Sequence, residues 1–376
     1  MKTHQVQQKT ERRISAALRL VFVAALLLGQ IALAFFLSAE LRQRAAIIYT
    51  VLELAAFGYA VRIYNRTDGT SYKFGWIFLV LTVPVVGLIL YFLWNGDRQQ
   101  KRLDLKKLPM PEEPEAQQAA HRIQMEKLRR KFPQWERLSV YLSRQGYLLY
   151  GDTETTYLPT GEAFLQDMLE KLEQAEHFIF MEFFIIAQGQ VWDRMEEIFR
   201  RKAAEGVEVK IIFDDFGSMM RFPAGQIEAL RESGVEVQVF NPVHHYVNRL
   251  YFNYRDHRKI VCIDGSTAYT GGANVADEYA NLTVRFGYWK DCGIRLDGPG
   301  AWGLTREFLH MWQRNGGQLM QERDYYRPHD HREAAGFCQP FVDGPDNNPI
   351  STAEDVFLHL INNARRSVHI TTPYLA

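Results

Sequence analysis

The sequence predicts an α/β protein that begins with transmembrane helices and continues into a mixed sheet covered by helices. The first observation is a set of long apolar segments within residues 1–96. Leu18–Leu37 alone has about 20 nearly all apolar residues, enough for a helix to cross a bilayer. The second is that, from about Tyr157, helix-spaced apolar segments alternate with short apolar runs. This alternation favours a parallel or mixed sheet between helices.

Composition excludes little and favours a local site. The 376 residues leave room for two or three domains, and 44 Lys plus Arg balance 44 Asp plus Glu. The balanced global charge therefore gives no sign of a polyanionic partner, and any phosphate recognition must be local. Cys262, Cys292 and Cys338 show neither zinc-ligand spacing nor a disulfide framework, which favours packed thiols. We expect no metal and no cofactor.

Residues 1–96 are predicted to be a membrane anchor with two or three transmembrane helices. A signal peptide is the alternative interpretation of Leu18–Leu37, but further apolar segments follow it. Ala45–Val61 is shorter and carries Glu53, which makes it the weakest span. Trp76–Trp94 is a clean apolar segment with a tryptophan at each end, as in interfacial anchoring.

Basic residues flank these segments on both sides and bear on topology. Three spans would place the basic N-terminus and the basic segment after Trp94 on opposite sides, whereas the positive-inside tendency prefers one side. We expect a multi-pass protein of the cell membrane whose catalytic lobe faces the cytoplasm. Residues 97–150, with Pro109, Pro111 and Pro114, are predicted to be a charged linker that is partly helical and able to lie along an anionic leaflet. A plain solvated helix is the alternative for its basic part.

Residues 151–330 show the helix and strand alternation most clearly. A helix is predicted over Phe164–Leu172 with Thr160 as its cap, followed by a buried strand within His177–Ile186. The next helix, Val191–Ala204, is expected to stop at Gly206. Further elements are strands at 207–213, 235–239 and 292–296, and helices around 227–230 and 302–314.

The stretch from His257 to Asn274 carries the candidate chemistry. It reads H-x-K-x4-D-x6-G-G-x-N. In an extended segment, His257 and Lys259 point to the same face and can reach one ligand. A neutral imidazole can attack phosphorus or move a proton near neutral pH, while Lys259 and Asn274 offer donors to phosphate oxygens. Gly272 lets backbone N–H groups approach the same oxygens.

Two carboxylates are candidates for the inner shell of this site. Glu182 lies within a buried apolar run and needs a partner, which is either the site or a structural arginine. Asp291 precedes a strand and, like Glu182, is a candidate to hold the second imidazole nitrogen of His257. Asp264, whose spacing defines the motif, is either catalytic or holds the strand and turn together by a salt bridge.

The spacing from His257 to Asn274 resembles the HKD signature of the phospholipase D superfamily, and nearly the whole chain resembles the bacterial cardiolipin synthases. The resemblance implies an α/β/α sandwich lobe over residues 151–330 and the start of a second such lobe over 331–376. Supporting segments are Trp76–Tyr91, Gly206–Val209, Asp214–Gly217, Tyr254–Lys259, Tyr288–Asp291 and Thr372–Tyr374.

The family carries two HKD motifs, and this sequence carries one. Residues 175–181 are weakly repeated at 364–370, an offset of 189, which puts a second motif histidine near position 446. We expect the second half-site to come from residues after Ala376 or, as the weaker alternative, from a second chain.

The resemblance implies a phosphatidyl transfer in which two phosphatidylglycerol molecules give cardiolipin and glycerol through a phosphohistidine intermediate. His257 is then one of the two motif histidines, and Lys259, Gly272 and Asn274 bind the phosphate. Phosphatidylglycerol and the bilayer are the expected partners, and nucleic acid is not. Two alternatives stay open, a phospholipase D-type hydrolase and a non-catalytic remnant.

Overall fold

The computed structural model describes residues 25, 28–32, 42–66, 70–94, 115–242, 255–285, 287–318, 325–326, 334, 336–344 and 351–372. These residues belong to two compact units. The N-terminal unit holds the described residues up to Trp94, and the C-terminal unit holds those from Glu115 onward.

The N-terminal unit contains the helices α2 (Arg42–Tyr64), α3 (Thr70–Thr82) and α4 (Pro84–Trp94). Within the described residues, Ile47–Tyr64 is the one helical segment long and apolar enough to cross a membrane. The segment that carries Glu53 was expected to be the weakest span, yet it forms this long helix. Most of Leu18–Leu37 lies outside the described residues.

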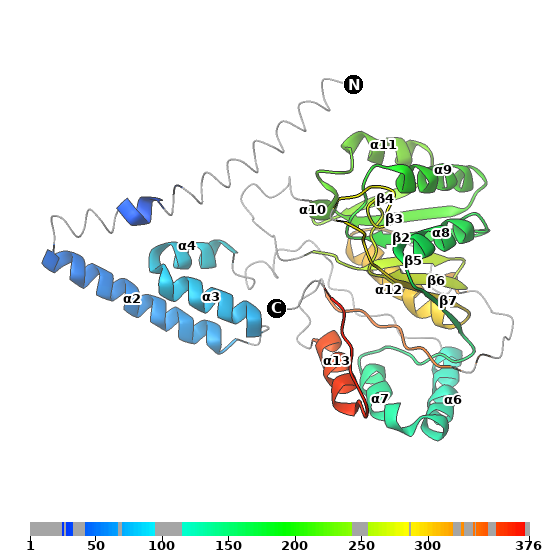
Figure 1. Ribbon diagram of the computed structural model, residues 1–376, viewed down its shortest axis with the longest axis horizontal. Helices are drawn as coiled ribbons and strands as arrows, with labels where there is room; N and C mark the ends of the chain where they lie inside the picture. Colours follow the sequence, from blue (N-terminus) through cyan, green and yellow to red (C-terminus); the bar gives the residue numbers. More distant parts are fainter. Residues whose placement is uncertain are drawn as a thin grey trace. The chain divides into compact units, whose positions relative to one another are not determined.

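Trp76–Trp94 does not form the single helix that the sequence suggested. The helix breaks after Thr82, and α4 begins at Pro84 and folds back along α3 (Figure 1). Proline has no N–H to continue the ladder, and its ring disfavours the helical conformation of the residue before it. The expectation that Trp76–Trp94 forms one continuous span was therefore wrong.

Residues 115–150 of the predicted linker form α6 (Glu115–Lys131), a short 3-10 turn (Pro133–Trp135) and α7 (Glu136–Arg144). They belong to the same compact unit as the sheet. The indole Nε1 of Trp302 donates a hydrogen bond to Gln117 Oε1 at 3.2 Å, within the buried core. Residues 97–114 lie outside the described residues.

The described residues of the C-terminal unit form one mixed sheet of seven strands, in the order β1, β7, β6, β5, β2, β3, β4. β2 and β3, and β3 and β4, pair in parallel, and the other neighbours pair antiparallel. The mixed sheet that the sequence predicted is confirmed. The strands are β1 (Glu154–Leu158), β2 (Phe178–Phe183), β3 (Glu208–Asp214), β4 (Glu236–Phe240), β5 (Lys259–Ile263), β6 (Thr267–Gly271) and β7 (Gly293–Asp297).

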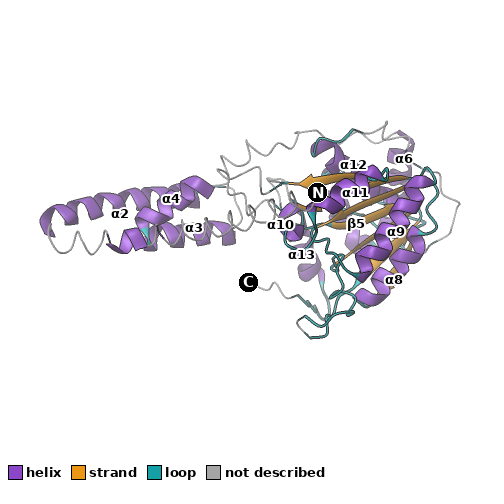
Figure 2. Ribbon diagram, turned by 90° about the horizontal axis from the view of Figure 1, so that it is seen from above, coloured by secondary structure: helices purple, strands orange, loops and turns teal. Residues whose placement is uncertain are grey.

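Helices cover both faces of this sheet (Figures 1 and 2). One face packs against α8 (Gly161–Leu172), α9 (Gln190–Ala204) and α11 (Ala224–Glu232), around Ile179 and Val261. The other face packs against α12 (Gly300–Arg314), whose Leu304, Phe308 and Trp312 are buried with Phe180 and Cys262. Successive residues of a strand therefore point alternately into the hydrophobic cores on the two faces of the sheet.

Predicted helix signals lie where the sequence placed them. Thr160 Oγ1 accepts a hydrogen bond from Ala163 N at 3.1 Å, and Gly206 adopts a φ of +92° after α9. The β5–β6 hairpin was not predicted. Its turn has positive φ at Asp264 and Gly265, and Asp-Gly is a strong hairpin signal that the motif had obscured.

The C-terminal part contains α13 (Thr352–Asn363), which directly precedes the weakly repeated residues 364–370. Residues 364–372 form no strand, although the weak repeat had suggested one. They are exposed, and a strand needs a neighbour to take up its N–H and carbonyl groups. The start of a second lobe over residues 331–376 stays a prediction.

Asp264 joins the far end of β5 to the start of β2. Its Oδ1 accepts hydrogen bonds from His177 N and Phe178 N at 2.7 and 2.8 Å, and its Oδ2 accepts one from Glu176 N at 2.8 Å. Three backbone donors on one carboxylate make a firm clamp, because each such charge-assisted bond is stronger than a neutral one.

We expect Asp264→Ala to lower the free energy of unfolding by about 3 kcal/mol, since it removes all three acceptors and leaves a positive φ on alanine. Asp264→Asn keeps one oxygen acceptor and tolerates that φ, so it should lose less. Urea unfolding of the detergent-solubilised protein measures both variants. An Asp264→Ala variant as stable as the wild type would contradict the clamp.

Candidate active site

One edge of the sheet gathers most of the motif. β5 runs antiparallel to β2, so Lys259 at its start lies opposite Phe183 at the end of β2. The end of β6 likewise lies beside the start of β7, with Gly271 opposite Gly293. The strand ends therefore bring the His257–Lys259 pair, the loop from Gly272 to Asn274 and Asp291 to the same edge.

His257 and Lys259 form the centre of this edge. Lys259 is buried, and its Nζ donates a hydrogen bond to the His257 carbonyl oxygen at 2.6 Å and lies 3.4 Å from His257 Nδ1. His257 lies at the surface, and its imidazole is partly buried where it packs on the Phe184 ring, with ring centroids 4.7 Å apart. The predicted juxtaposition of imidazole and amine on one face is present.

The electrostatics of this pair suit a neutral imidazole beside an amine. Burial lowers the pKa of Lys259 to about 8, against the opposing effect of the Asp256 and Asp291 carboxylates. Burial and the nearby Lys259 also lower the pKa of His257 below its usual 6.5. At pH 7 the imidazole is mostly neutral and the amine is mostly charged, which is the combination needed to attack a phosphodiester and to hold its oxygens.

Asn274 is buried, and its amide is partly committed to the protein. Its Oδ1 accepts a hydrogen bond from Ile185 N at 3.1 Å, and its Nδ2 donates one to Tyr279 Oη at 2.9 Å. An amide nitrogen carries two protons, so one donor remains beyond the Tyr279 bond. Tyr279, which the sequence did not single out, thus orients the predicted phosphate-binding amide.

Gly272 makes room for Asp291. A β-carbon at position 272 would lie 2.2 Å from Asp291 Oδ1. The same carboxylate accepts hydrogen bonds from Trp289 Nε1 at 3.2 Å and from Cys292 N at 2.9 Å. The glycine was expected to let the backbone approach phosphate, and the structure gives it the additional role of admitting a carboxylate.

Glu182 lies on the other face of the sheet from Lys259, so it does not reach the second nitrogen of His257. Glu182 lies opposite Ile260 in the pairing of β2 with β5. Its Oε1 lies 3.0 Å from Arg258 Nε, and the same Nε lies 3.3 Å from Asp256 Oδ1. Burial raises the pKa of the Glu182 carboxyl well above its usual range, and Arg258 opposes that shift. The structural-arginine alternative, and not the inner-shell one, describes this contact.

Asp264 is also separated from His257. It follows β5 while His257 precedes it, and a five-residue strand spans about 17 Å. The structure therefore places Asp264 at the opposite edge of the sheet, where it clamps β2.

Asp214 holds the segment that leads into the motif by hydrogen bonds. It is fully buried, and its carboxylate accepts hydrogen bonds from Phe216 N at 2.9 Å, Arg255 Nη1 at 3.2 Å and Asp256 N at 3.0 Å. Burial raises its pKa to about 6, and Arg255 opposes the shift. Capping of the turn thus accounts for this aspartate.

Within the described residues, no three His, Cys, Asp or Glu side chains gather as a metal site.

Comparison with known proteins places this site in a family. Residues 168–284 match the family described as cardiolipin synthase, PLD-like domain, and residues 54–95 match the phospholipase D-nuclease N-terminal family. An uncharacterized protein of Streptococcus mutans is 35% identical over 323 residues, which cover 85% of this chain and 69% of that protein. The chain belongs to the bacterial cardiolipin synthase family of the phospholipase D superfamily.

Named cardiolipin synthases are similar over the same region. Cardiolipin synthase 2 of Bacillus anthracis is 31% identical over 323 residues, covering 85% of this chain and 62% of the relative. The major cardiolipin synthase ClsA of Bacillus subtilis is 28% identical over 329 residues, covering 83% and 66%. The chain thus spans a little under two thirds of these two synthases.

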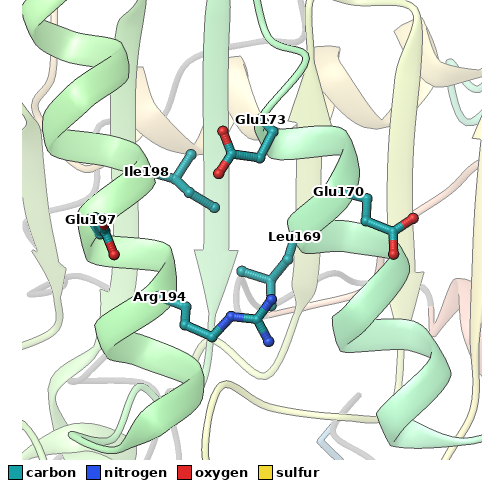
Figure 3. A pocket seen from close by; sticks show the side chains of 6 residues that line it. All are labelled: Leu169, Glu170, Glu173, Arg194, Glu197 and Ile198. Atoms are coloured by element: carbon teal, nitrogen blue, oxygen red, sulfur yellow. The ribbon is translucent and has the colours of Figure 1, made fainter.

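A shallow groove lies elsewhere on this cardiolipin synthase-like lobe, between α8 and α9 (Figure 3). Carboxylates dominate it, and Arg194 is its single cation. An acidic groove repels phosphate, and none of the motif residues lines it. Its lining residues are Leu169, Glu170, Glu173, Arg194, Glu197 and Ile198.

We expect Gly272→Ala to destabilise the fold by about 1–3 kcal/mol, because the added methyl group overlaps the Asp291 carboxylate. Gly336→Ala is the matched control, since nothing lies within 4 Å of a β-carbon there. Thermal unfolding in detergent measures the difference. Equal melting temperatures for the two variants would show that Asp291 does not occupy this space.

Proposed function

We propose that the chain provides the membrane-anchored first half-site of a phosphatidyltransferase that makes cardiolipin from two phosphatidylglycerol molecules. The observation that carries the proposal is the pair of His257 and Lys259 on one face of the sheet edge, with both pKa values lowered. Membership in the cardiolipin synthase family supports the choice of substrate.

In the first step, a ring nitrogen of neutral His257 attacks the phosphorus of phosphatidylglycerol. The phosphorus–oxygen bond to glycerol breaks, and the glycerol oxygen takes a proton from a general acid, the histidine of the second HKD motif. Lys259 and the remaining Nδ2 proton of Asn274 bind the non-bridging oxygens. The product is a phosphatidyl-histidine and free glycerol.

In the second step, a hydroxyl group of another phosphatidylglycerol displaces the histidine. The second motif histidine, now neutral, accepts the hydroxyl proton, and cardiolipin leaves. Water in place of the lipid hydroxyl gives phosphatidic acid. Lysine and asparagine side chains of the two motifs supply the positive field, so the proposed reaction uses neither metal nor cofactor.

The second motif is proposed to come from residues that follow this chain in the longer protein, with association of two chains as the alternative. The lobe is proposed to face the cytoplasm from a multi-pass anchor in the cell membrane. One apolar helix of spanning length and the match to the N-terminal family support the anchor.

Labelled phosphatidylglycerol in mixed micelles tests the reaction. We expect the protein with both motifs to release cardiolipin and glycerol, and His257→Ala to lower the rate about 10³-fold or more. His177→Ala is the control, because that exposed histidine lies at the opposite edge. Phosphatidic acid as the sole product would favour the hydrolase, and full synthesis by residues 1–376 as monomers would overturn the half-site.

The lowered pKa values predict a bell-shaped dependence of kcat/KM on pH. The rate falls below the pKa of His257, under 6.5, as the imidazole gains a proton and loses its nucleophilic lone pair. It falls above about 8 as Lys259 loses its charge and its hold on phosphate. In Lys259→Arg the guanidinium stays charged, so the alkaline limb should move upward. An alkaline limb that stays near 8 in this variant would exclude Lys259 as its source.

A further inference from the structure

The two helices that replace the expected third span are each too short to cross a membrane. α3 has 13 residues and α4 has 11. At 1.5 Å per residue they are about 20 and 16 Å long, against a hydrocarbon core of about 30 Å. Neither α3 nor α4 can cross alone.

The pair is a hairpin and not a bent rod. A β-carbon on Gly87 would lie 2.5 Å from Leu79 O and 2.8 Å from Val80 Cα. In one continuous helix these residues would be about 12 Å apart along the axis. α4 therefore doubles back on α3, as Figure 1 shows, and the missing side chain of Gly87 permits the close approach.

Both open ends of the hairpin lie beside the C-terminal end of α2. Arg66 Nη1 donates a hydrogen bond to Tyr91 Oη at 3.3 Å, which ties the last turns of α4 to α2. Lys73 Nζ, in the first turn of α3, donates to Tyr64 O and Arg66 O at 3.3 and 3.0 Å. Basic and tyrosine side chains of this kind are typical of the membrane interface.

The tip of the hairpin is capped by a polar side chain from the first apolar segment. Gln30 Oε1 accepts a hydrogen bond from Val86 N at 2.9 Å, in the first turn of α4. A helix start inside hydrocarbon leaves backbone donors that water cannot reach, so an internal partner is required. Gln30 lies in the interior of Leu18–Leu37, which sets the tip at mid-membrane depth.

The outer surface of this unit is apolar, as contact with acyl chains requires. Phe57, Phe74 and Phe78 are 62%, 70% and 69% exposed, while Ala56 and Val80 are buried between the helices. The helices bury their own apolar cluster, which includes Ile63 and Tyr91, and still present large apolar side chains outward, as a unit surrounded by acyl chains does.

We propose that residues 70–94 form a re-entrant hairpin that enters the bilayer and leaves on the same side, with Gln30 capping its tip. Leu18–Leu37 and α2 are then the two full crossings. The basic N-terminus and the basic segment after Trp94 lie on one side, as the positive-inside tendency prefers. The inference rests on the membrane anchor of the proposed function and is independent of its chemistry.

Single cysteines test the topology. R42C, T67C and N95C are introduced into the full protein with its native cysteines replaced, and sealed vesicles of each orientation are treated with a membrane-impermeant maleimide. We expect positions 67 and 95 to react from one side and position 42 from the other. Reaction of position 95 from the side of position 42 would overturn the hairpin.

A second measurement avoids replacing the native cysteines. Protease sites inserted after Gly69 and after Gly96 are digested in the same sealed vesicles. Cleavage of both from one side supports the hairpin, and cleavage from opposite sides contradicts it. Recovery of the chain without detergent would instead overturn the membrane anchor itself, so failure of the anchor and failure of the hairpin are distinguishable.

Discussion

The site depends on a short strand that carboxylates hold at both ends. At the far end of β5, Asp264 accepts three backbone N–H groups from the start of β2. At the near end, Asp214 accepts the N–H of Asp256, whose own carboxylate accepts the N–H of Arg258. With β5 fixed at both ends, the alternation of its side chains is fixed too, and consecutive cations enter opposite faces of the sheet.

The cations on the two faces differ in how far neighbouring carboxylates compensate their charge. Arg258 enters the closed face, where Glu182 and Asp256 lie within 3.3 Å and compensate its charge. Lys259 enters the open edge, where burial outweighs the neighbouring carboxylates and its pKa falls to about 8. Removing the partners of a paired buried cation is costly, whereas a buried cation with less compensation gains from a bound anion. One dipeptide thus separates a structural cation, Arg258, from the cation proposed to bind phosphate, Lys259.

Particular residues show how far the sequence could go. Period-two alternation was enough to put His257 and Lys259 on one face, and helix caps such as Thr160 and Gly206 follow from local chemistry. The partner of Glu182 depends on which strand pairs with β2, a long-range fact that local patterns do not contain. Tyr279, which orients Asn274, has the same limitation. The break at Pro84 could have been predicted from the proline itself. The apolar length of Trp76–Trp94 nevertheless favoured one continuous span.

The central claim is that His257 forms the covalent intermediate of phosphatidyl transfer. The protein that contains both motifs is mixed with labelled phosphatidylglycerol, the reaction is quenched rapidly without acid, and the peptides are analysed by mass spectrometry. This experiment tests the claim directly. The account predicts an acid-labile phosphatidyl group on the peptide that carries His257, and its loss in His257→Ala. A phosphatidyl group on another histidine, still formed in His257→Ala, would contradict it.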